Sequence, residues 1–543
     1  AVDEPECWPD GVHPIIAALN DLGVDCATLG NHEFNYGLPF LRQAMAGRTY
    51  PIVSSNITLS GSQEPLFAPW VILERRFVDE GGRHHDLKLG VFGVCPRQIL
   101  KWDRHHLEGE VEVADLVEAA GLAMERLRQE GADIIIGLSH SGIVDRTATW
   151  GMENATQAIA KKLSPDALIA GHTHKYFPDV SMPITGGIDP HEGTLHGVPT
   201  VQPGFWGSHL GVVDLELCLR DKKWHVEGAH SELRRAAQFD QPSTRLTAFT
   251  QEAHQRTLSR MQRPIGQTPM PLNTYFAQVA PDIGLELMLR AQEHWARQVL
   301  GNSDIPILAA ASPMKAGGFT GQDHYVDIPA GPLTQRHASD LYFYPNTLAI
   351  LRATGAQVRD WLERSASQFA TIPQGARGGP LLCVASPAYD FDVLSGLQAQ
   401  FDISGPPAFC PETYTPCTGR RVVDLTRDGV PVEPTDQFYL VTSAYRAGGG
   451  GGFPLDGMAL VEDVPSTTAR EALTAYLQED GTVAPVPKVH WSLAPLASTT
   501  AYFDTGPGAR RGQVPLPKGF SYLGPGENGF DRYLVRLDAL IQG

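Results

Sequence analysis

The sequence has no uninterrupted apolar run of the roughly 20 residues that a membrane-spanning helix needs, and no charged-then-apolar signal segment opens it. An excess of basic residues is also missing, because 43 Lys and Arg stand against 61 Asp and Glu, for a formal net charge of -18. This balance argues against binding to a nucleic-acid polymer, whose phosphates are neutralised by Lys and Arg. We therefore expect neither a membrane span nor a nucleic-acid polymer as a partner.

Cysteine is scarce, with seven residues in 543. They are too scattered for a zinc knuckle and too few for a disulfide scaffold. Only Cys410 and Cys417 stand close together, in a stretch rich in Pro and Gly, and a disulfide and two separate thiols are equally compatible with that spacing.

The composition is that of an ordinary globular protein, with 42% hydrophobic and 19% charged residues. Because 543 residues exceed the size at which one hydrophobic core stops growing, we expect two large domains. We place the first domain at residues 1–235, a connecting helix or linker at 236–265, and the second domain at 266–543. A helical spacing of apolar residues over 242–261, followed by a Pro-Gly break, indicates the connecting helix.

The first domain repeats one local pattern three times: a helix, a Gly or Pro break, a short apolar strand and a small polar cluster. This order is typical of an α/β layer. The predicted strands cover 24–29, 134–138 and 166–170. Each polar cluster follows the carboxyl end of its strand, which is where open α/β sheets form their ligand crevices.

These three polar clusters are rich in metal-binding side chains. They read Gly30-Asn31-His32-Glu33, Ser139-His140 and Gly171-His172-Thr173-His174. Each cluster alone is weak, because a surface histidine or a Gly-Asn turn is common. Together they bring an amide oxygen and several imidazoles to one sheet edge, and neutral imidazole is a common metal ligand.

In this order the clusters resemble the Gly-Asn-His-Glu, later His and Gly-His-x-His motifs of the calcineurin-like metallophosphoesterases. The resemblance implies an N-terminal αββα sandwich with two divalent cations per complete site, for which Mn, Zn, Mg, Co and Fe are equally suitable. It implies that Asn31, His140 and His172 bind one cation and that His174 binds the other. His32 would stabilise the transition state or protonate the leaving oxygen.

The family's two earlier motifs, Asp-x-His and Gly-Asp, have no counterpart before Gly30. They would supply the carboxylate that bridges two cations about 3.5 to 4 Å apart. We therefore expect a sandwich without its first strands and a site depleted in metal. A truncated start or omitted residues would both explain the pattern.

The second half resembles the C-terminal domain of the nucleotidase branch, and within it the bacterial 2′,3′-cyclic-nucleotide 2′-phosphodiesterase/3′-nucleotidases. The matching stretches cover 310–318, 340–348, 389–393 and 444–452. The resemblance implies an α+β domain in which Phe391 and Tyr445 sandwich the nucleobase, with stacking worth about 1 to 3 kcal/mol. Lys315, Asn346 and Arg446 are candidates to hold ribose or phosphate. Core packing for the two rings, and surface or capping roles for the three polar residues, remain alternatives.

The expected function is hydrolysis of nucleotide phosphate esters by a two-metal mechanism, with the nucleoside held in the C-terminal domain. The expected substrates are 2′,3′-cyclic nucleotides and 3′-nucleotides. Alternatives are a 5′-nucleotidase or nucleotide-sugar hydrolase, and a catalytically impaired nucleotide-binding protein. The resemblance also implies a periplasmic or secreted location.

Overall fold

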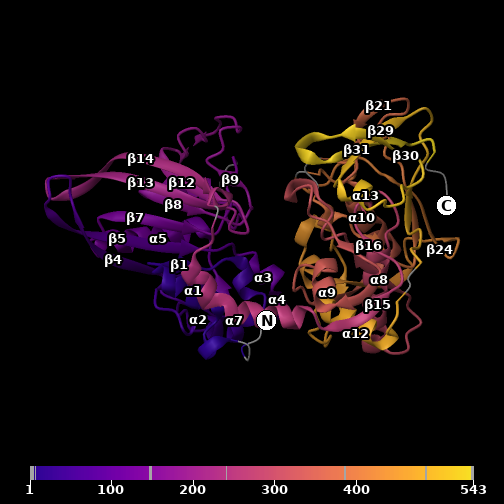
Figure 1. Ribbon diagram of the computed structural model, residues 1–543, viewed down its shortest axis with the longest axis horizontal. Helices are drawn as coiled ribbons and strands as arrows, with labels where there is room; N and C mark the ends of the chain where they lie inside the picture. The colour runs from indigo at the N-terminus through magenta and orange to yellow at the C-terminus, as the bar shows by residue number, and fades with distance from the viewer. Residues whose placement is uncertain are drawn as a thin grey trace. The chain divides into compact units, whose positions relative to one another are not determined.

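A computed structural model of the chain describes Pro5 and residues 8–145, 149–239, 241–383, 387–411, 413–483 and 486–539. The chain divides into two units, residues 1–258 and 259–543 (Figure 1). The division falls inside helix α7 (Thr244–Met261), where the sequence predicts a connecting helix. None of the described helices combines the length and the apolar character needed to cross a membrane.

The helices of the first unit are α1 (Pro14–Leu22), α2 (Gly37–Met45), α3 (Ile99–Trp102), α4 (Arg104–Leu107), α5 (Leu116–Gln129), α6 (Thr156–Leu163) and α7. Its strands are β1 (Ala27–Thr28), β2 (Ile52–Val53), β3 (Ile57–Leu59), β4 (Trp70–Val78), β5 (His84–Val94), β6 (Val111–Val113), β7 (Ile134–Ser139), β8 (Ala167–Ala170), β9 (Tyr176–Phe177), β10 (Ile188–Asp189), β11 (Thr194–Leu195), β12 (Val198–Pro203), β13 (His209–Arg220) and β14 (Lys223–Arg235).

The main sheet of the first unit has the strand order β10-β11-β12-β8-β7-β5-β4, and β9 pairs with β12. Strands β5, β7, β8 and β12 run parallel to one another. The sequence of β7 is almost continuously apolar, as expected for a parallel strand covered on both faces. Two of the three predicted strands are thus observed nearly as expected, as β7 and β8. The third, expected over 24–29, is shorter, because only Ala27–Thr28 pairs with β2.

Helices α5 and α6 pack against this sheet. The side chain of Asp115 caps α5 by accepting hydrogen bonds from the backbone N–H groups of Val117 and Glu118. The apolar face of α5, which includes Leu116 and Leu127, is buried in one cluster with residues of β7, α6 and β8. A second apolar cluster joins β1, α2, α3, α4 and the short 3₁₀ turn that begins at Asn31. These two apolar clusters fix the helices and turns that surround the strands of the first unit.

The helices of the second unit are α8 (Ile283–Leu300), α9 (Gln335–Leu341), α10 (Gly355–Ala366), α11 (Ala444–Ala447), α12 (Ala469–Asp480) and α13 (Gly508–Arg511). Its strands are β15 (Pro264–Thr268), β16 (Leu272–Asn273), β17 (Ile307–Ala311), β18 (Asp327–Ile328), β19 (Gly331–Thr334), β20 (Leu348–Thr354), β21 (Arg377–Pro380), β22 (Val393–Leu394), β23 (Gln398–Phe401), β24 (Val422–Arg427), β25 (Val430–Pro431), β26 (Gln437–Ser443), β27 (Ala459–Leu460), β28 (Trp491–Leu493), β29 (Thr500–Thr505), β30 (Phe520–Pro525) and β31 (Asp531–Arg536).

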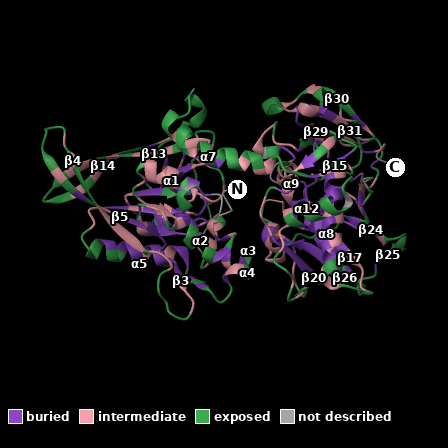
Figure 2. Cartoon of the chain, turned by 60° about the horizontal axis from the view of Figure 1, so that its bottom comes forward, coloured by how far each residue is buried: buried purple, intermediate pink, exposed green. Residues whose placement is uncertain are grey.

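The second unit is built around a mixed sheet of order β22-β17-β26-β20-β27, with smaller sheets β21-β29-β31-β30 and β25-β24-β23-β28. One large apolar core links these sheets with α8, α10 and α12, and Figure 2 shows the buried residues on their inner faces. A buried ionic group lies beside this core, where Glu286 accepts hydrogen bonds from Arg290 and His490. Cys417 is an exposed thiol, so a disulfide between Cys410 and Cys417 is not formed.

Candidate active site

The three polar clusters of the first unit lie at the ends of short strands, as the sequence predicts. Asn31 begins the 3₁₀ turn after β1, His140 follows β7, and His172 and His174 follow β8. Both His172 and His174 have a left-handed backbone, with φ of 72° and 58°. Non-glycine residues adopt this conformation rarely and at some energetic cost, and functional sites are enriched in it.

The side chains of these clusters converge. The Oδ1 atom of Asn31 lies 2.9 Å from Nε2 of His140 and 3.2 Å from Nδ1 of His172. Burial, together with the charges of His172, His32 and His174, lowers the pKa of His140 to about 3. The structure therefore joins Asn31, His140 and His172 directly, with His32 and His174 close enough to act on the pKa of His140.

The backbone at Gly30 allows the approach. A Cβ atom at this position would lie 2.6 Å from Cε1 of His140, closer than a real carbon contact. The carboxylate of Glu33 accepts a hydrogen bond from the N–H of Gly30 and holds the turn in place. A side chain at position 30 would thus push Asn31 and His140 apart.

The contacts of His172 fit a bound cation. Its Nε2 lies 2.8 Å from a carboxylate oxygen of Glu153, while its Nδ1 faces the amide oxygen of Asn31. Both neighbours are acceptors, but a neutral imidazole has only one N–H. A cation held by Nδ1 and Oδ1 resolves this mismatch and leaves the Nε2 proton for Glu153, in the carboxylate-histidine-metal arrangement.

The distances also suit a shared cation. Neighbouring ligands of an octahedral cation, each about 2.1 Å from it, lie about 3 Å apart. The two N···O distances at Asn31, 2.9 and 3.2 Å, match this value. In the part of the chain that the structure describes, no three His, Cys, Asp or Glu side chains form a metal-binding group. The fit therefore depends on the amide oxygen of Asn31 with two imidazoles, and His174 stands apart with its ring against Phe205, at a centroid distance of 5.6 Å.

Sequence reasoning missed two residues that hold His172. One is Glu153, and the other is Trp102, whose ring stacks on the imidazole at 5.4 Å. Trp102 ends α3 and Glu153 lies in a loop before α6. Neither position belongs to a strand-end cluster, so no local pattern in the sequence could have found them.

The aromatic pair predicted in the second unit needs a correction. Phe391 is completely buried, with its ring in edge contact with Phe369 and Trp491 at 5.8 and 5.1 Å. No face of this ring is open to a nucleobase in this structure, which favours core packing for Phe391, the alternative to the predicted stacking role. The reason is local, because a 3₁₀ turn over Ala388–Asp390 directs the following phenylalanine into the core.

Tyr389, within the same 3₁₀ turn, is the better partner for Tyr445. Both side chains are only partly buried. Burial raises the pKa of the Tyr389 hydroxyl, and the charges of Asp390, Tyr344 and Tyr445 raise it further, which places these groups near one another. The ring of Tyr445 lies against the backbone of Gly450, where a Cβ atom would come within 2.4 Å of it.

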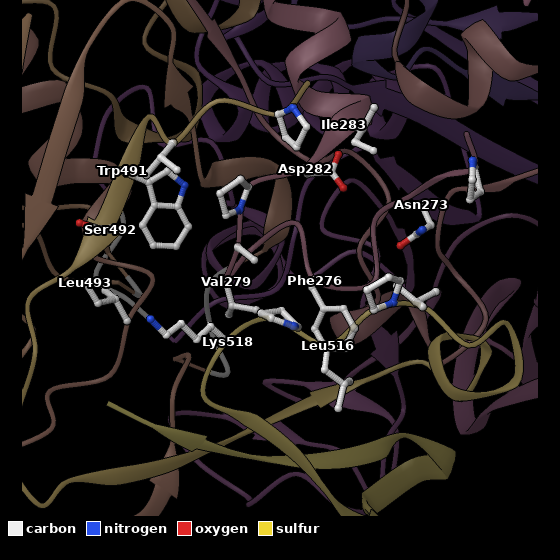
Figure 3. A pocket seen from close by; sticks show the side chains of 18 residues that line it. Asn273, Phe276, Val279, Asp282, Ile283, Trp491, Ser492, Leu493, Leu516 and Lys518 are labelled. Carbon is white, nitrogen blue, oxygen red and sulfur yellow. The ribbon is translucent and has the colours of Figure 1, made fainter. Parts of the chain in front are cut away.

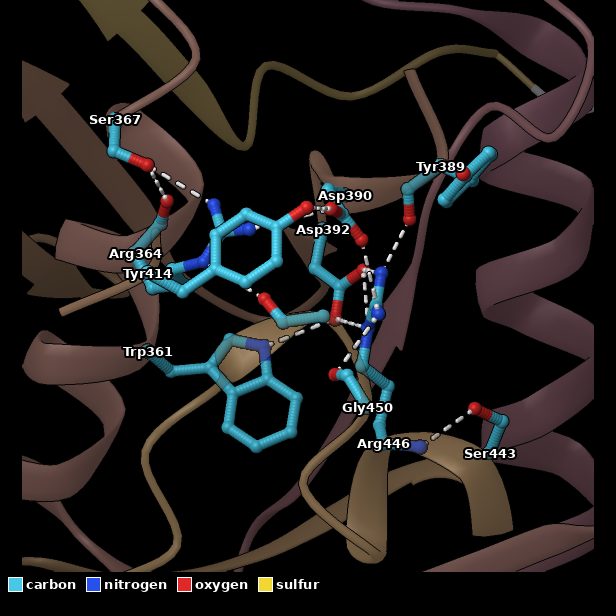
Figure 4. Close-up of polar contacts among 11 residues, drawn as sticks. Trp361, Arg364, Ser367, Tyr389, Asp390, Asp392, Tyr414, Ser443, Arg446 and Gly450 are labelled. Atoms are coloured by element: carbon cyan, nitrogen blue, oxygen red, sulfur yellow. Dashed lines mark hydrogen bonds and ion pairs between the residues drawn. The ribbon is translucent and has the colours of Figure 1, made fainter. Parts of the chain in front are cut away.

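Arg446 is buried in a network of charges and not exposed for a ligand (Figure 4). Its guanidinium donates to both carboxylate oxygens of Asp392, to Asp390 at 3.2 Å, and to the carbonyl oxygens of Tyr389 and Gly450. These contacts use all three nitrogens of the side chain. These contacts favour a structural role for Arg446 over the predicted direct contact with substrate, because the side chain binds the backbone at Tyr389 and Gly450.

Arg364 completes this network. It donates to Asp390 at 3.3 Å and to the carbonyl of Gly451 at 2.9 Å, and the hydroxyl of Tyr414 donates to the same carboxylate at 3.0 Å. The Nε1 of Trp361 donates to Asp392 at 3.1 Å. Two arginines thus balance two aspartates, as buried charges require.

The remaining two candidates have partners within the protein. Lys315 forms an ion pair with Asp340, and its ammonium group lies over the ring of Phe343. The side chain of Asn346 forms a hydrogen bond with the Tyr342 hydroxyl, and the backbone carbonyl oxygen of Asn346 accepts one from the N–H of Ala469. These contacts favour supporting roles for Lys315 and Asn346 at the edge of the predicted pocket.

A separate cavity of about 440 Å³ lies elsewhere in the second unit (Figure 3). Its walls come from segments 271–283, 487–493 and 514–518, and they include Phe276, Trp491 and several prolines. None of the predicted substrate-binding residues lines it. Its apolar walls make it distinct from the polar cluster around Tyr389.

Comparison with known proteins gives a consistent result for both units. The family model described as calcineurin-like phosphoesterase matches residues 3–176, and the model described as 5′-nucleotidase, C-terminal domain, matches residues 285–456. The chain is 35% identical to the 2′,3′-cyclic-nucleotide 2′-phosphodiesterase/3′-nucleotidase of Salmonella typhimurium, with 97% of this chain and 85% of the relative covered.

Two further similarities bear on length and fold. The trifunctional nucleotide phosphoesterase YfkN of Bacillus subtilis is 38% identical over 91% of this chain, which spans only 34% of that longer protein. A putative 5′-nucleotidase from Staphylococcus aureus has the same fold, with a TM-score of 0.67, 20% identity, and coverage of 88% of this chain and 85% of that one.

Proposed function

Because the chain belongs to the 2′,3′-cyclic-nucleotide 2′-phosphodiesterase/3′-nucleotidase family, we propose that it hydrolyses 2′,3′-cyclic nucleotides and 3′-nucleotides. Membership in this family makes it a metal-dependent phosphoric ester hydrolase. The observation that best supports the proposal is the convergence of His140 and His172 on the amide oxygen of Asn31.

In the first unit, Asn31, His140 and His172 are the ligands of one divalent cation, and His174 is a ligand of the second. Bound cations supply positive charge that neutralises the phosphate oxygens as the ester is cleaved. His32 protonates the departing ribose oxygen. Imidazole nitrogens favour Zn and Fe, whereas the amide oxygen suits Mn and Mg, so this mixed set of ligands does not single out one metal.

In the second unit, Tyr389 and Tyr445 hold the nucleobase between them. Stacking on a tyrosine ring accepts every base, because each base has a π-face, and contributes about 1 to 3 kcal/mol. The proposed pocket therefore still has two aromatic rings, with Tyr389 in place of Phe391. Arg446 stabilises this pocket, because it donates hydrogen bonds to Asp390 and to the backbone carbonyl of Tyr389.

The two proposed reactions require the same help. Opening a 2′,3′-cyclic phosphate releases the ribose 2′ oxygen, and cleaving the 3′-nucleotide releases the 3′ oxygen. Both are alkoxides and therefore poor leaving groups, so each needs a proton as the bond to phosphorus breaks. A single histidine placed as a general acid serves both steps. A periplasmic or secreted location suits a scavenging activity on small nucleotides, and we propose it for this chain.

The test compares 3′-AMP, 2′,3′-cyclic AMP and 5′-AMP as substrates with added Mn²⁺. Phosphate release is measured for the two nucleotides, and formation of 3′-AMP is measured for the cyclic nucleotide. Hydrolysis of the first two in preference to 5′-AMP is expected. A preference for 5′-AMP would establish a 5′-nucleotidase instead, and adenosine binding without turnover would indicate an impaired binding protein.

A matched pair of variants links the activity to the metal site. His140→Ala should abolish both turnover and bound Mn²⁺, measured by elemental analysis after dialysis. His230→Ala, which changes an exposed histidine of β14, should leave both unchanged.

A further inference from the structure

A buried carboxylate lies close to His32 and has no role in the proposed chemistry so far. Asp103 sits between α3 and α4 and is 4% exposed. Its Oδ1 accepts a hydrogen bond from Nδ2 of Asn35 at 2.9 Å, while its Oδ2 has no hydrogen-bond partner among the described residues. Burial raises the pKa of Asp103 to about 6. A carboxylate with one hydrogen bond and little solvent is costly to the fold.

Asn35 connects this carboxylate to the imidazole. Its Oδ1 lies 2.8 Å from Nδ1 of His32. The three side chains therefore form a chain of hydrogen bonds, Asp103 to Asn35 to His32. Asn35 follows the 3₁₀ turn that also carries Asn31. This series of hydrogen bonds therefore ends at a histidine next to Asn31 in the sequence.

The direction of each hydrogen bond follows from the carboxylate. An ionised carboxylate can only accept, so it must face the NH₂ group of Asn35. The amide oxygen of Asn35 then faces His32, and an amide oxygen also can only accept. Nδ1 of His32 must therefore carry a proton, which leaves Nε2 to take up a second proton, and this Nε2 proton is the one that the ring donates to a leaving oxygen.

We infer that Asp103 is a positioning residue that acts through Asn35 to fix the tautomer and orientation of His32. The inference rests on the proposed function in one respect, that His32 protonates the leaving oxygen. Without the charge at position 103, the amide of Asn35 is free to turn over and present its NH₂ group to the imidazole. Nδ1 would then accept a hydrogen bond, and the single proton of the neutral ring would move to Nε2. The ring could no longer hold protons on both nitrogens, and a neutral imidazole is a poor proton donor.

The backbone around Asp103 supports a positioning role. Its carbonyl oxygen accepts hydrogen bonds from the N–H groups of His106 and Leu107, which fixes the junction between α3 and α4. The preceding residue, Trp102, stacks on His172. The junction between α3 and α4 thus contacts His172 through Trp102, and it reaches His32 from Asp103 through Asn35.

The first test uses leaving groups of different quality. A ribose oxygen needs protonation much more than p-nitrophenolate does. Asp103→Asn should therefore lower kcat for 3′-AMP by at least about 10-fold and change kcat for p-nitrophenyl phosphate by less than about 3-fold. The KM for 3′-AMP should stay unchanged, because the nucleoside is held in the other unit.

A swap of the two side chains gives the sharper readout. Asn35→Asp alone places two carboxylates side by side and should also lower kcat for 3′-AMP. The double variant N35D/D103N has one carboxylate and one amide in reversed order, and the carboxylate then accepts directly from Nδ1 of His32. Its kcat for 3′-AMP should recover most of the loss. Asp115→Asn is the matched control, because Asp115 is equally buried, at 5% exposed, but caps α5, and it should not alter the ratio of the two kcat values.

The tautomer can also be read without any turnover. The ¹⁵N chemical shifts of the His32 ring at about pH 8 should show a protonated Nδ1 in the wild type and a shift toward protonated Nε2 in D103N. Equal loss of kcat for both esters, no recovery in the swap, or a wild-type ring protonated at Nε2 would each overturn the inference.

These outcomes are distinct from failure of the proposed function. If the wild type cleaved 5′-AMP in place of 3′-AMP, the substrate proposal would fail. The comparison of a ribose ester with an aryl ester would still test Asp103, because 5′-AMP also releases an alkoxide. If the wild type cleaved neither ribose ester, the ring nitrogen shifts would decide the inference alone.

Discussion

Removal of the Arg446 guanidinium tests how the second unit holds its two partly exposed tyrosines. We consider Arg446→Met, which keeps an unbranched apolar stem and removes the charge. In the variant, the hydrogen bond from Trp361 at 3.1 Å is the only one of the side-chain hydrogen bonds described for Asp392 that remains. Asp390 keeps both Arg364 at 3.3 Å and Tyr414 at 3.0 Å. The variant therefore leaves Asp392 almost uncompensated inside the protein.

The expected cost is large. Removing one member of a buried ion pair typically destabilises a protein by about 3 to 5 kcal/mol, because the remaining charge stays buried. Domains are typically stable by only about 5 to 15 kcal/mol. Arg446→Met should therefore take a substantial part of the free energy of unfolding of the second unit. Replacing both partners, in R446M/D392L, should recover much of this loss, because no unpaired charge remains.

The assay is urea denaturation followed by tryptophan fluorescence and circular dichroism. Two units give two transitions, and the two signals have to be fitted together. Trp361 is fully buried in the network, so its fluorescence reports on the second unit. The coupling energy of Arg446 with Asp392 should exceed that with Asp390, which has a second arginine. A cost below about 1 kcal/mol for Arg446→Met, or strictly additive costs in R446M/D392L, would refute this reasoning.

Three further predictions concern the second unit. Tyr389→Ala and Tyr445→Ala should each weaken adenosine binding by about 1 to 3 kcal/mol in calorimetry, with hydrolysis of bis(p-nitrophenyl) phosphate, which has no base, unchanged. Phe391→Ala should instead lower the free energy of unfolding by about 3 to 5 kcal/mol and leave adenosine affinity intact, and unaltered stability would contradict its place in the core. Burial alone would raise the pKa of Glu286, but hydrogen bonds from its basic neighbours outweigh it and lower the pKa from 4.5 to about 2. Its carboxylate therefore stabilises the folded state above about pH 4.5, by roughly 3 kcal/mol, and this contribution falls away as the pH drops toward 2. Glu286→Gln should lower the free energy of unfolding at neutral pH and reduce its dependence on pH between 4.5 and 2. An unchanged dependence in this range would contradict the role given to Arg290 and His490.

The convergence of His140 and His172 on Asn31 could be predicted because it depends on local patterns. His140 and His172 follow apolar strands, and the carboxyl ends of parallel strands meet at one edge whatever the rest of the chain does. Glu153 could not be found in this way. It reaches His172 from a loop whose path is set by tertiary packing, and no periodicity marks it.

The pocket in the second unit shows the opposite limit. The sequence match assigned Phe391 and Arg446 to substrate because they lie in the right stretches. Whether a side chain in such a stretch points outward depends on one turn, here the 3₁₀ turn that ends at Asp390. Arg446 is buried because two aspartates more than 50 positions earlier surround it, and a contact of that sequence separation leaves no local trace.

The close packing of Gly450 against Tyr445 has a practical consequence for protein engineering. Any residue larger than glycine there would force the ring out of its place, since even a methyl group would overlap it at 2.4 Å. Mutant libraries aimed at a new base preference should therefore leave this glycine run untouched. Diversity is better introduced at Tyr344, whose ring contacts that of Tyr389 edge-on at a centroid distance of 6.4 Å.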